Sequence, residues 1–112
     1  MEYNMRDFSI QEVIDIINSL DNNSNIQPTK HFQQTNNLRH TDNNLWAKVL
    51  FNNELMSITK QAENKFKTCF KHPHKKDKDI YIIMLITEQV SIKLITTYEA
   101  KSSKRKGENE SR

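Results

Sequence analysis

The sequence predicts an α+β domain in which one or two N-terminal helices pack on a four-stranded, mostly antiparallel meander sheet. Hydrophobic residues recur at helical spacing in the first half of the chain, and after Asn53 the period changes to the alternation of strands. The 112 residues are enough for a single small domain, which we place at residues 1–100. Residues 101–112 are polar and basic and are predicted to form a flexible tail.

The first helix is predicted from the signals at its N-terminus. Ser9 and Glu12 have the spacing of a capping box, and Phe8 and Val13 have that of a hydrophobic staple. Apolar residues then recur at helical spacing with polar residues opposite them. We therefore expect an amphipathic helix that ends near Asp21.

The middle of the chain is harder to assign. Residues 21–30 are predicted to form a loop, because Pro28 disfavours helical conformation in the residue before it. A second helix is expected over residues 45–50, with Trp46 in its apolar stripe and therefore in the core. No shape is assigned to residues 31–40.

Four strands are predicted after this helix. Residues 55–60 and 65–71 alternate in polarity and are joined by a turn. Residues 80–86 are almost continuously apolar, which is typical of a central strand covered on both sides. Residues 90–99 alternate again and form the last strand.

The alternation also assigns the two faces of the sheet. The first helix is expected to cover the face that carries the phenylalanines of residues 65–71. The opposite face is expected to carry Lys65, Lys67 and Lys93, together with one or more histidines. Strict alternation in the last strand would place Tyr98 on the face opposite to Lys93.

The composition favours a soluble, cytoplasmic protein. Cys69 is the single cysteine, so no intramolecular disulfide can form. We expect no secretory signal and no association with a membrane, because the N-terminus lacks an apolar run and no stretch approaches ~18 apolar residues. The single glycine, Gly107, disfavours the glycine-rich loops that bind nucleotide phosphates. The net charge is +3, and the basic residues concentrate after Lys60, which favours a polyanion such as RNA as partner.

The stretch "KHPHKKDK" at residues 71–78 is the most chemically loaded part of the chain. A metal site would have to use His72, His74 and Cys69, three ligands surrounded by positive charge, so we expect no metal and no cofactor. A solvated turn between two strands is an alternative interpretation. The interpretation that fits the charge distribution better is a phosphate-binding surface. Its predicted residues are Lys65, Lys67, Lys71, Lys75, Lys76, Lys104 and Arg105.

Two segments carry a family resemblance. "IKLITTYEAKSSKR" at residues 92–105 resembles the closing strand and basic tail of RelE-superfamily ribonuclease toxins, especially the BrnT branch, although Tyr98 stands where BrnT-like chains tend to have arginine. "IYIIM" at residues 80–84 is similar to the tyrosine-bearing central strand of the MqsR branch. The spacing from His31 to Arg39 is similar to that in small related families.

The resemblance implies a metal-independent endoribonuclease that works with an antitoxin partner. Lys93 then matches the basic residue of the last strand, Tyr81 the central-strand tyrosine, and Lys104 and Arg105 the basic tail. Histidines titrate near neutral pH, so His31 and His72 are candidates for proton transfer on chemical grounds. The catalytic candidates are therefore His31, His72, Tyr81 and Lys93.

Three functional hypotheses remain from the sequence. The first is a toxin-like endoribonuclease or RNA-binding protein of a toxin-antitoxin system. The second is a binding module for nucleic acid or protein without catalysis, such as a small viral or mobile-element regulator. The third treats the basic residues as a solvated surface with no partner. The oligomeric state does not follow from the sequence.

Overall fold

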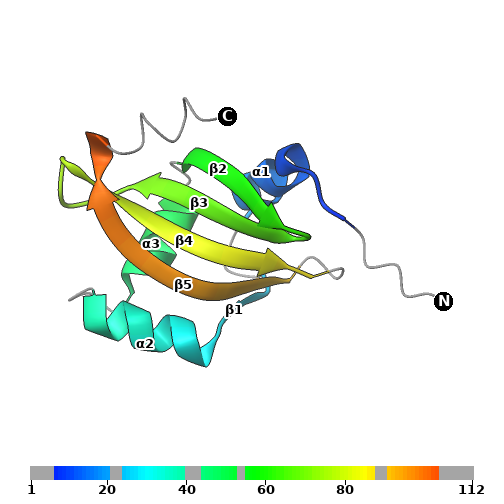
Figure 1. Ribbon diagram of the computed structural model, residues 1–112, viewed down its shortest axis with the longest axis horizontal. Helices are drawn as coiled ribbons and strands as arrows, with labels where there is room; N and C mark the ends of the chain where they lie inside the picture. The colour runs from blue at the N-terminus through cyan, green and yellow to red at the C-terminus, as the bar shows by residue number, and fades with distance from the viewer. Residues whose placement is uncertain (1–6, 21–23, 40–43, 53–54, 88–90, 104–112) are drawn as a thin grey trace.

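The computed structural model describes residues 7–20, 24–39, 44–52, 55–87 and 91–103. These residues form helices and a five-stranded mixed sheet (Figure 1). The elements are α1 (Ile10–Asn18), β1 (Ile26–Pro28), α2 (Lys30–Arg39), α3 (Leu45–Asn52), β2 (Leu55–Ala62), β3 (Lys65–Lys71), β4 (Lys78–Ile86) and β5 (Ile92–Lys101).

The predicted α+β class is confirmed, and the sheet has one strand more than predicted. Its order is β1-β5-β4-β3-β2, in which β2 to β5 form the expected antiparallel meander. The extra strand β1 runs parallel to β5 and pairs Ile26 with Ile92. The prediction of a loop over residues 21–30 was wrong here, because a strand of three residues leaves almost no periodicity to read.

Helix α1 has the N-terminus that its sequence indicates. The backbone N–H of Glu12 donates to the Ser9 hydroxyl at 3.2 Å, and the Ser9 N–H donates to the Glu12 carboxylate at 2.9 Å. Both partners of the staple, Phe8 and Val13, are buried. The helix ends at Asn18.

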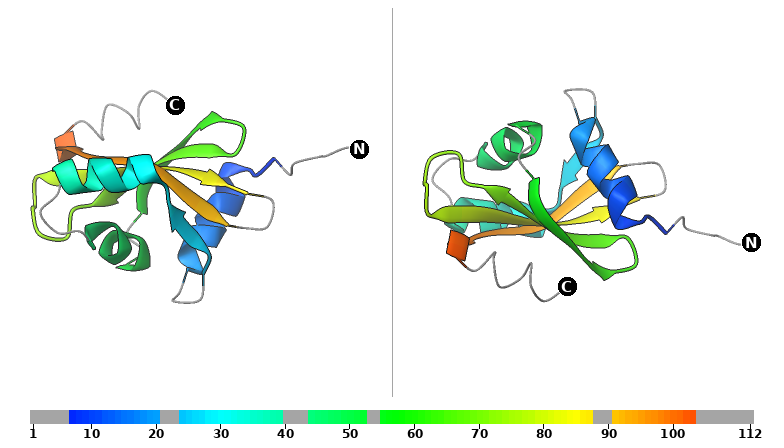
Figure 2. Two further views of the ribbon diagram at one scale, coloured as in Figure 1. Left: turned by 90° about the horizontal axis from the view of Figure 1, so that it is seen from below. Right: turned by 90° about the horizontal axis from the view of Figure 1, so that it is seen from above.

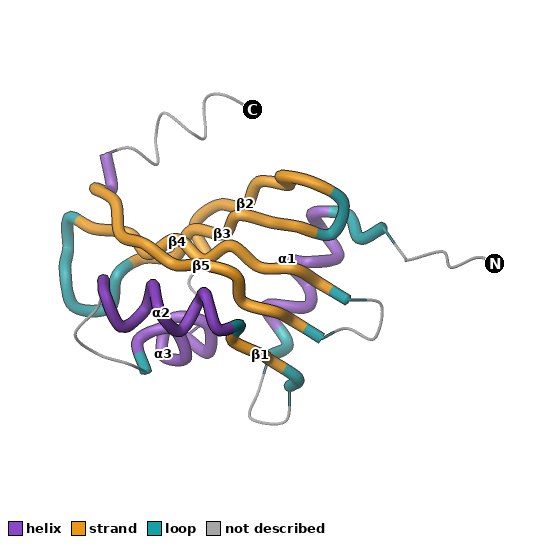
Figure 3. The backbone as a smooth tube through the Cα atoms, turned by 60° about the horizontal axis from the view of Figure 1, so that its bottom comes forward, coloured by secondary structure: helices purple, strands orange, loops and turns teal. Residues whose placement is uncertain are grey.

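Helix α3 confirms the second predicted helix, whereas α2 was not predicted. α2 continues the line of β1 along the edge of β5 (Figure 3). At its start, the Thr29 hydroxyl accepts the Phe32 N–H at 3.2 Å and donates to the Leu94 carbonyl at 2.7 Å. At its end, the Arg39 guanidinium donates to the Thr97 carbonyl at 2.9 Å. These bonds occupy the carbonyl of Leu94, which pairs with the last residue of β1, and that of Thr97 further along β5.

The hydrophobic core lies on one face of the sheet. α1 and α3 lie on the same side of the sheet, whereas α2 follows its edge (Figure 2). Val13 and Ile17 of α1 and Val49 and Leu50 of α3 are buried against this face. The sheet contributes Ile58, Phe66, Phe70, Ile80, Ile82, Met84, Ile86, Ile92 and Leu94 to the same core.

A β-bulge changes the faces of β5. Ile83 pairs with Thr96 and the next residue, Met84, pairs with Leu94, so Ile95 is an extra residue. Lys93 and Tyr98 therefore lie on the same side of the sheet. The strict alternation predicted for this strand was wrong, because a bulge is set by pairing with β4 and not by the hydrophobic pattern of β5.

The C-terminal end of the described chain is tied to the sheet. β5 extends to Lys101, and the Ser102 N–H donates to the Asp77 carbonyl at 2.9 Å. Residues 104–112, most of the predicted tail, lie outside the described residues. None of the helices that the structure describes is long and apolar enough to cross a membrane.

Candidate nucleic-acid interface

The face of the sheet opposite to the core is not covered by α1 or α3, and we call it the open face. α2 borders it, with the Thr35 hydroxyl 3.5 Å from that of Thr96, and Cys69, Asp79 and Tyr81 are buried within it. Its composition follows from the pairing of β3, β4 and β5, because neighbours in register point to the same side. It joins lysines from two strands to aliphatic and aromatic side chains from the strand between them. The members are Lys65, Lys67, Cys69 and Lys71 of β3, Asp79, Tyr81, Ile83 and Leu85 of β4, and Lys93, Thr96, Tyr98 and Ala100 of β5.

One end of the open face places an apolar strip between two lysines. Leu85 pairs with Lys65 on one side and with Lys93 on the other. Leu85 and its neighbour Ile83 are half-buried, so the prediction that both sides of the central strand are covered was wrong at these positions. This end can contact a ligand that has an apolar or aromatic part between negative charges.

Further along the open face, two tyrosines stack across β4 and β5. The rings of Tyr81 and Tyr98 are 5.0 Å apart with an interplanar angle of 5°. The Lys67 ammonium lies 5.5 Å from the centre of the Tyr81 ring, within the range of a cation–π contact. Tyr81 is 1% exposed, whereas Tyr98 is half-buried. Tyr98 is therefore the ring of the pair that a bound base can reach, and Tyr81 packs against it from the neighbouring strand.

His72, in the loop between β3 and β4, has both ring nitrogens engaged, Nδ1 by the loop and Nε2 by β5. Nδ1 accepts the backbone N–H of His74 at 3.0 Å and that of Lys75 at 3.1 Å. Nε2 lies 3.4 Å from the Glu99 carboxylate. Because Nδ1 is an acceptor, the neutral ring carries its proton on Nε2.

Burial lowers the pKa of His72 below its ordinary value of 6.5. The Glu99 carboxylate opposes this shift, and the charges of Lys75 and His74 add to it. A second proton would have to enter at Nδ1 and displace both backbone N–H groups. The imidazole is thus held in its neutral form, and its role in the structure is to shape the loop.

The remaining predicted phosphate-binding residues differ in their surroundings. Lys71 belongs to the open face, and Lys76 is exposed in the loop. The Lys75 ammonium lies 3.3 Å from the Glu99 carboxylate, so part of its charge is already balanced. Lys104 and Arg105 lie outside the described residues.

The four catalytic candidates do not meet at one place. Tyr81 and Lys93 share the open face, but four residues of β4 separate their levels, which is about 13 Å along the strand at roughly 3.3 Å per residue. His72 contacts Glu99, which pairs with Ile80 of the core face. The histidine expected beside the lysines is therefore not His72. His31 is exposed on α2, at the edge of β5.

The sequence did not single out Glu99, and it indicated Arg39 only through its spacing from His31. These two residues hold the loop and the edge around this face. Glu99 lies in a strand whose faces are reassigned by the bulge, so its approach to His72 could not be read from alternation. Arg39 lies in the segment to which no shape was assigned. Its signals in the sequence were its spacing from His31 and its place as a basic residue in the last turn of a helix that was itself not predicted.

Comparison with known proteins gives one result. The model of the MJ0788 family matches residues 11–86, a segment that runs from α1 to the end of β4. The description of that family names no activity. No curated protein and no solved structure matches the chain.

Proposed function

The chain belongs to the MJ0788 family, and from the geometry of its open face we propose that it binds single-stranded RNA. The observation that carries the proposal is the half-buried Tyr98, stacked on Tyr81, on a face that also carries Lys67 beside Tyr81 and Lys65 and Lys93 further along the strands. Unpaired bases stack on aromatic rings, and lysines alongside neutralise the phosphates between them. A double helix offers no free base faces, so a single strand fits this surface better.

The path of the strand follows from the arrangement of the face. Bases would lie over Leu85, Ile83 and Tyr98, and the phosphates would contact Lys65 and Lys67 on one side and Lys93 on the other. Hydrophobic and aromatic contacts of this kind tolerate many sequences, since every base has a ring face. We therefore expect affinity that depends strongly on salt and weakly on base sequence.

Binding without cleavage is favoured over cleavage by the separation of the catalytic candidates. Transfer of a phosphoryl group to the RNA 2′-hydroxyl needs a base, an acid and a cation around one phosphate. Tyr81 is buried and about 13 Å from the level of Lys93. The RelE-type hypothesis, with an antitoxin covering the same face, would add cleavage to binding.

The first prediction concerns the lysines of the open face. The variant Lys65→Gln/Lys93→Gln is compared with Lys30→Gln/Lys48→Gln, which removes the same charge from exposed positions of α2 and α3. Binding of a labelled RNA of about 12 nucleotides is measured by fluorescence anisotropy over a range of salt concentrations. We expect the slope of log affinity against log salt to fall by about 1.4 in the open-face variant, since each phosphate contact with a single strand contributes about 0.7.

The salt slope of the open-face variant is compared with that of the control variant, and the RNA is checked for cleavage. Equal slopes in the two variants, or no binding by the wild type at low salt, would contradict the proposal. Tyr98→Ala should weaken binding by about 1–3 kcal/mol and Tyr98→Phe should not, because stacking needs the ring and not the hydroxyl. RNA that is cut by the wild type and left intact by Lys93→Ala and His31→Ala would support the endoribonuclease hypothesis instead.

A further inference from the structure

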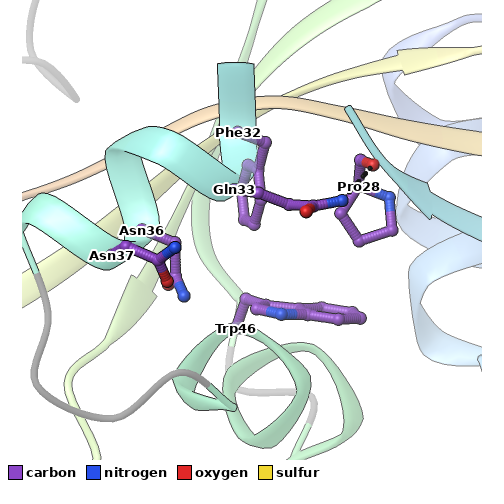
Figure 4. A pocket seen from close by; sticks show the side chains of 6 residues that line it. All are labelled: Pro28, Phe32, Gln33, Asn36, Asn37 and Trp46. Carbon is purple, nitrogen blue, oxygen red and sulfur yellow. Dashed lines mark hydrogen bonds between the residues drawn. The ribbon is translucent and has the colours of Figure 1, made fainter. Parts of the chain in front are cut away.

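A second surface of the chain differs from the lysine-rich open face because its lining residues are uncharged. It has the composition of a small-molecule site. A pocket of about 270 Å³ lies between β1, α2 and α3 and is lined by Pro28, Phe32, Gln33, Asn36, Asn37 and Trp46 (Figure 4). None of these described lining residues carries a charge. The site is therefore suited to an uncharged ligand, and the proposed RNA-binding surface does not account for it.

One wall of the pocket is aromatic. The half-buried indole of Trp46 faces Pro28 and Gln33 across the gap (Figure 4). Its position is fixed by an edge-to-face contact with the buried ring of Phe32, at 6.2 Å between centroids and 88° between planes. A flat ring that enters the gap would meet the face of the indole on one side. This geometry selects planar ligands.

The other wall is a row of amides. Gln33, Asn36 and Asn37 are spaced i, i+3 and i+4, which places them on one face of α2. Asn36 is 4% exposed, and the Gln33 amide is oriented by its N–H donation to the Pro28 carbonyl at 3.3 Å. Side-chain amides offer a donor and an acceptor side by side, which is the pattern that matches the edge of a nucleobase.

From these two walls we infer that the pocket binds a nucleobase, and that a purine fits it best. The size supports this choice, because a cavity of about 150 Å³ holds one benzene ring and this pocket has room for a second. The base would stack on Trp46 and present its hydrogen-bonding edge to Asn37 and Gln33. It could come either as a free base or as one base of a nucleic-acid strand, and both present the same edge.

The second prediction tests this site with adenine as the probe. Trp46 is the single tryptophan of the chain, so saturable quenching of its fluorescence reports on the pocket, and calorimetry gives the affinity. Asn37→Ala is compared with Gln34→Ala, its exposed neighbour on α2 that does not line the pocket. We expect Asn37→Ala to weaken adenine binding about fivefold to tenfold, the effect of one lost hydrogen bond, and Gln34→Ala to leave it unchanged.

Indole, which has a similar ring pair but no acceptor, should bind at least about tenfold more weakly than adenine. Indole binding as tightly as adenine, equal affinities of the two variants, or no saturable quenching would each overturn the inference. An oligoadenylate that displaces adenine identifies a base of a strand as the ligand, and one that does not displace it identifies the free base. The open-face variant Lys65→Gln/Lys93→Gln should bind adenine like the wild type, so failure of the RNA-binding proposal and failure of this one are distinguishable.

Discussion

In the loop between β3 and β4, the imidazole of His72 accepts hydrogen bonds that a backbone carbonyl would accept in an ordinary turn. Two consecutive N–H groups, of His74 and Lys75, converge on its Nδ1. Asparagine makes the same kind of turn with its side-chain oxygen. The ring thus satisfies donors that the short loop would otherwise leave without a protein acceptor, and its burial at 6% exposure follows from this position.

The third prediction is that His72 makes the protein less stable in mild acid. Its pKa is lowered in the folded state, chiefly by burial, so above pH 6.5 the ring is neutral in both states and the full stability is present. As the pH falls below 6.5, the unfolded chain binds a proton that the folded chain resists. The free energy of unfolding, measured with urea between about pH 8 and pH 5, should therefore decrease.

His72→Asn should keep the turn through its side-chain oxygen and remove this part of the decrease. His74→Asn, which removes the neighbouring exposed histidine, should retain it. A decrease that is the same in His72→Asn as in the wild type would contradict the assignment. At the level of single residues, the sequence indicated that "KHPHKKDK" joins two strands, but it could not show the direction of the His72 side chain, because that depends on Glu99 of β5.

Among the connecting elements, the turn between β2 and β3 joins three parts of the fold. Asn64 has a φ of 61°, the left-handed conformation that asparagine tolerates. Its side-chain oxygen accepts the Phe8 N–H at 2.8 Å, and its backbone carbonyl accepts the Ile86 N–H at 2.9 Å. One residue therefore links the entry of α1 to the end of β4 while it reverses the chain.

The fourth prediction separates the two roles of Asn64. Asn64→Gly keeps the backbone conformation but removes the acceptor of the buried Phe8 N–H, which should lower the free energy of unfolding by about 1–3 kcal/mol. Asn64→Ala removes the same acceptor and also places a Cβ in the left-handed region, at a further cost of about 1–2 kcal/mol. Urea unfolding of both variants tests whether Asn64→Ala is less stable than Asn64→Gly. Equal stability of the two would show that the backbone conformation carries no cost.

Helices and strands with a clear hydrophobic period or capping signal in their own sequence were predictable. Those that form only because they pack on another element were not. The capping box fixed the start of α1, and the alternation of residues 65–71 matches β3 at both ends. α2 is rich in glutamine and asparagine and buries only Phe32, Thr35 and Asn36. Its local signals, Thr29 at the start and Arg39 in the last turn, do not reveal the packing along β5 on which its helical state depends.

On the scale of the whole molecule, the core is continuous from α1 through the sheet to α3. The same buried cluster includes Ile17, Phe66, Leu50 and Leu94, which come from four different elements. A small domain with one such core unfolds in a single cooperative step. The candidate interface, by contrast, was predictable only in part. Its lysines lie on strands that the sequence predicted. Its tyrosine pair depends on the bulge in β5, which the sequence did not predict.

The fifth prediction is that unfolding is two-state. Fluorescence of Trp46 reports on the contact between α2 and α3, and far-ultraviolet circular dichroism is dominated by the sheet and helices together. Because both depend on one core, the two signals should give the same urea midpoint. A fluorescence change that clearly precedes the change in circular dichroism would mean that α2 and α3 open as a separate unit.

The parallel pairing of β1 with β5 also determines when β1 can join the sheet during protein synthesis. Ile26 finds its partner Ile92 only after most of the chain has left the ribosome, and the helix that follows β1 needs the same strand. Contacts between such distant parts of a chain slow folding. The β1 and α2 segments should therefore lack their partner strand until β5 is synthesised, and in that interval the nascent chain is the form most exposed to proteases and chaperones.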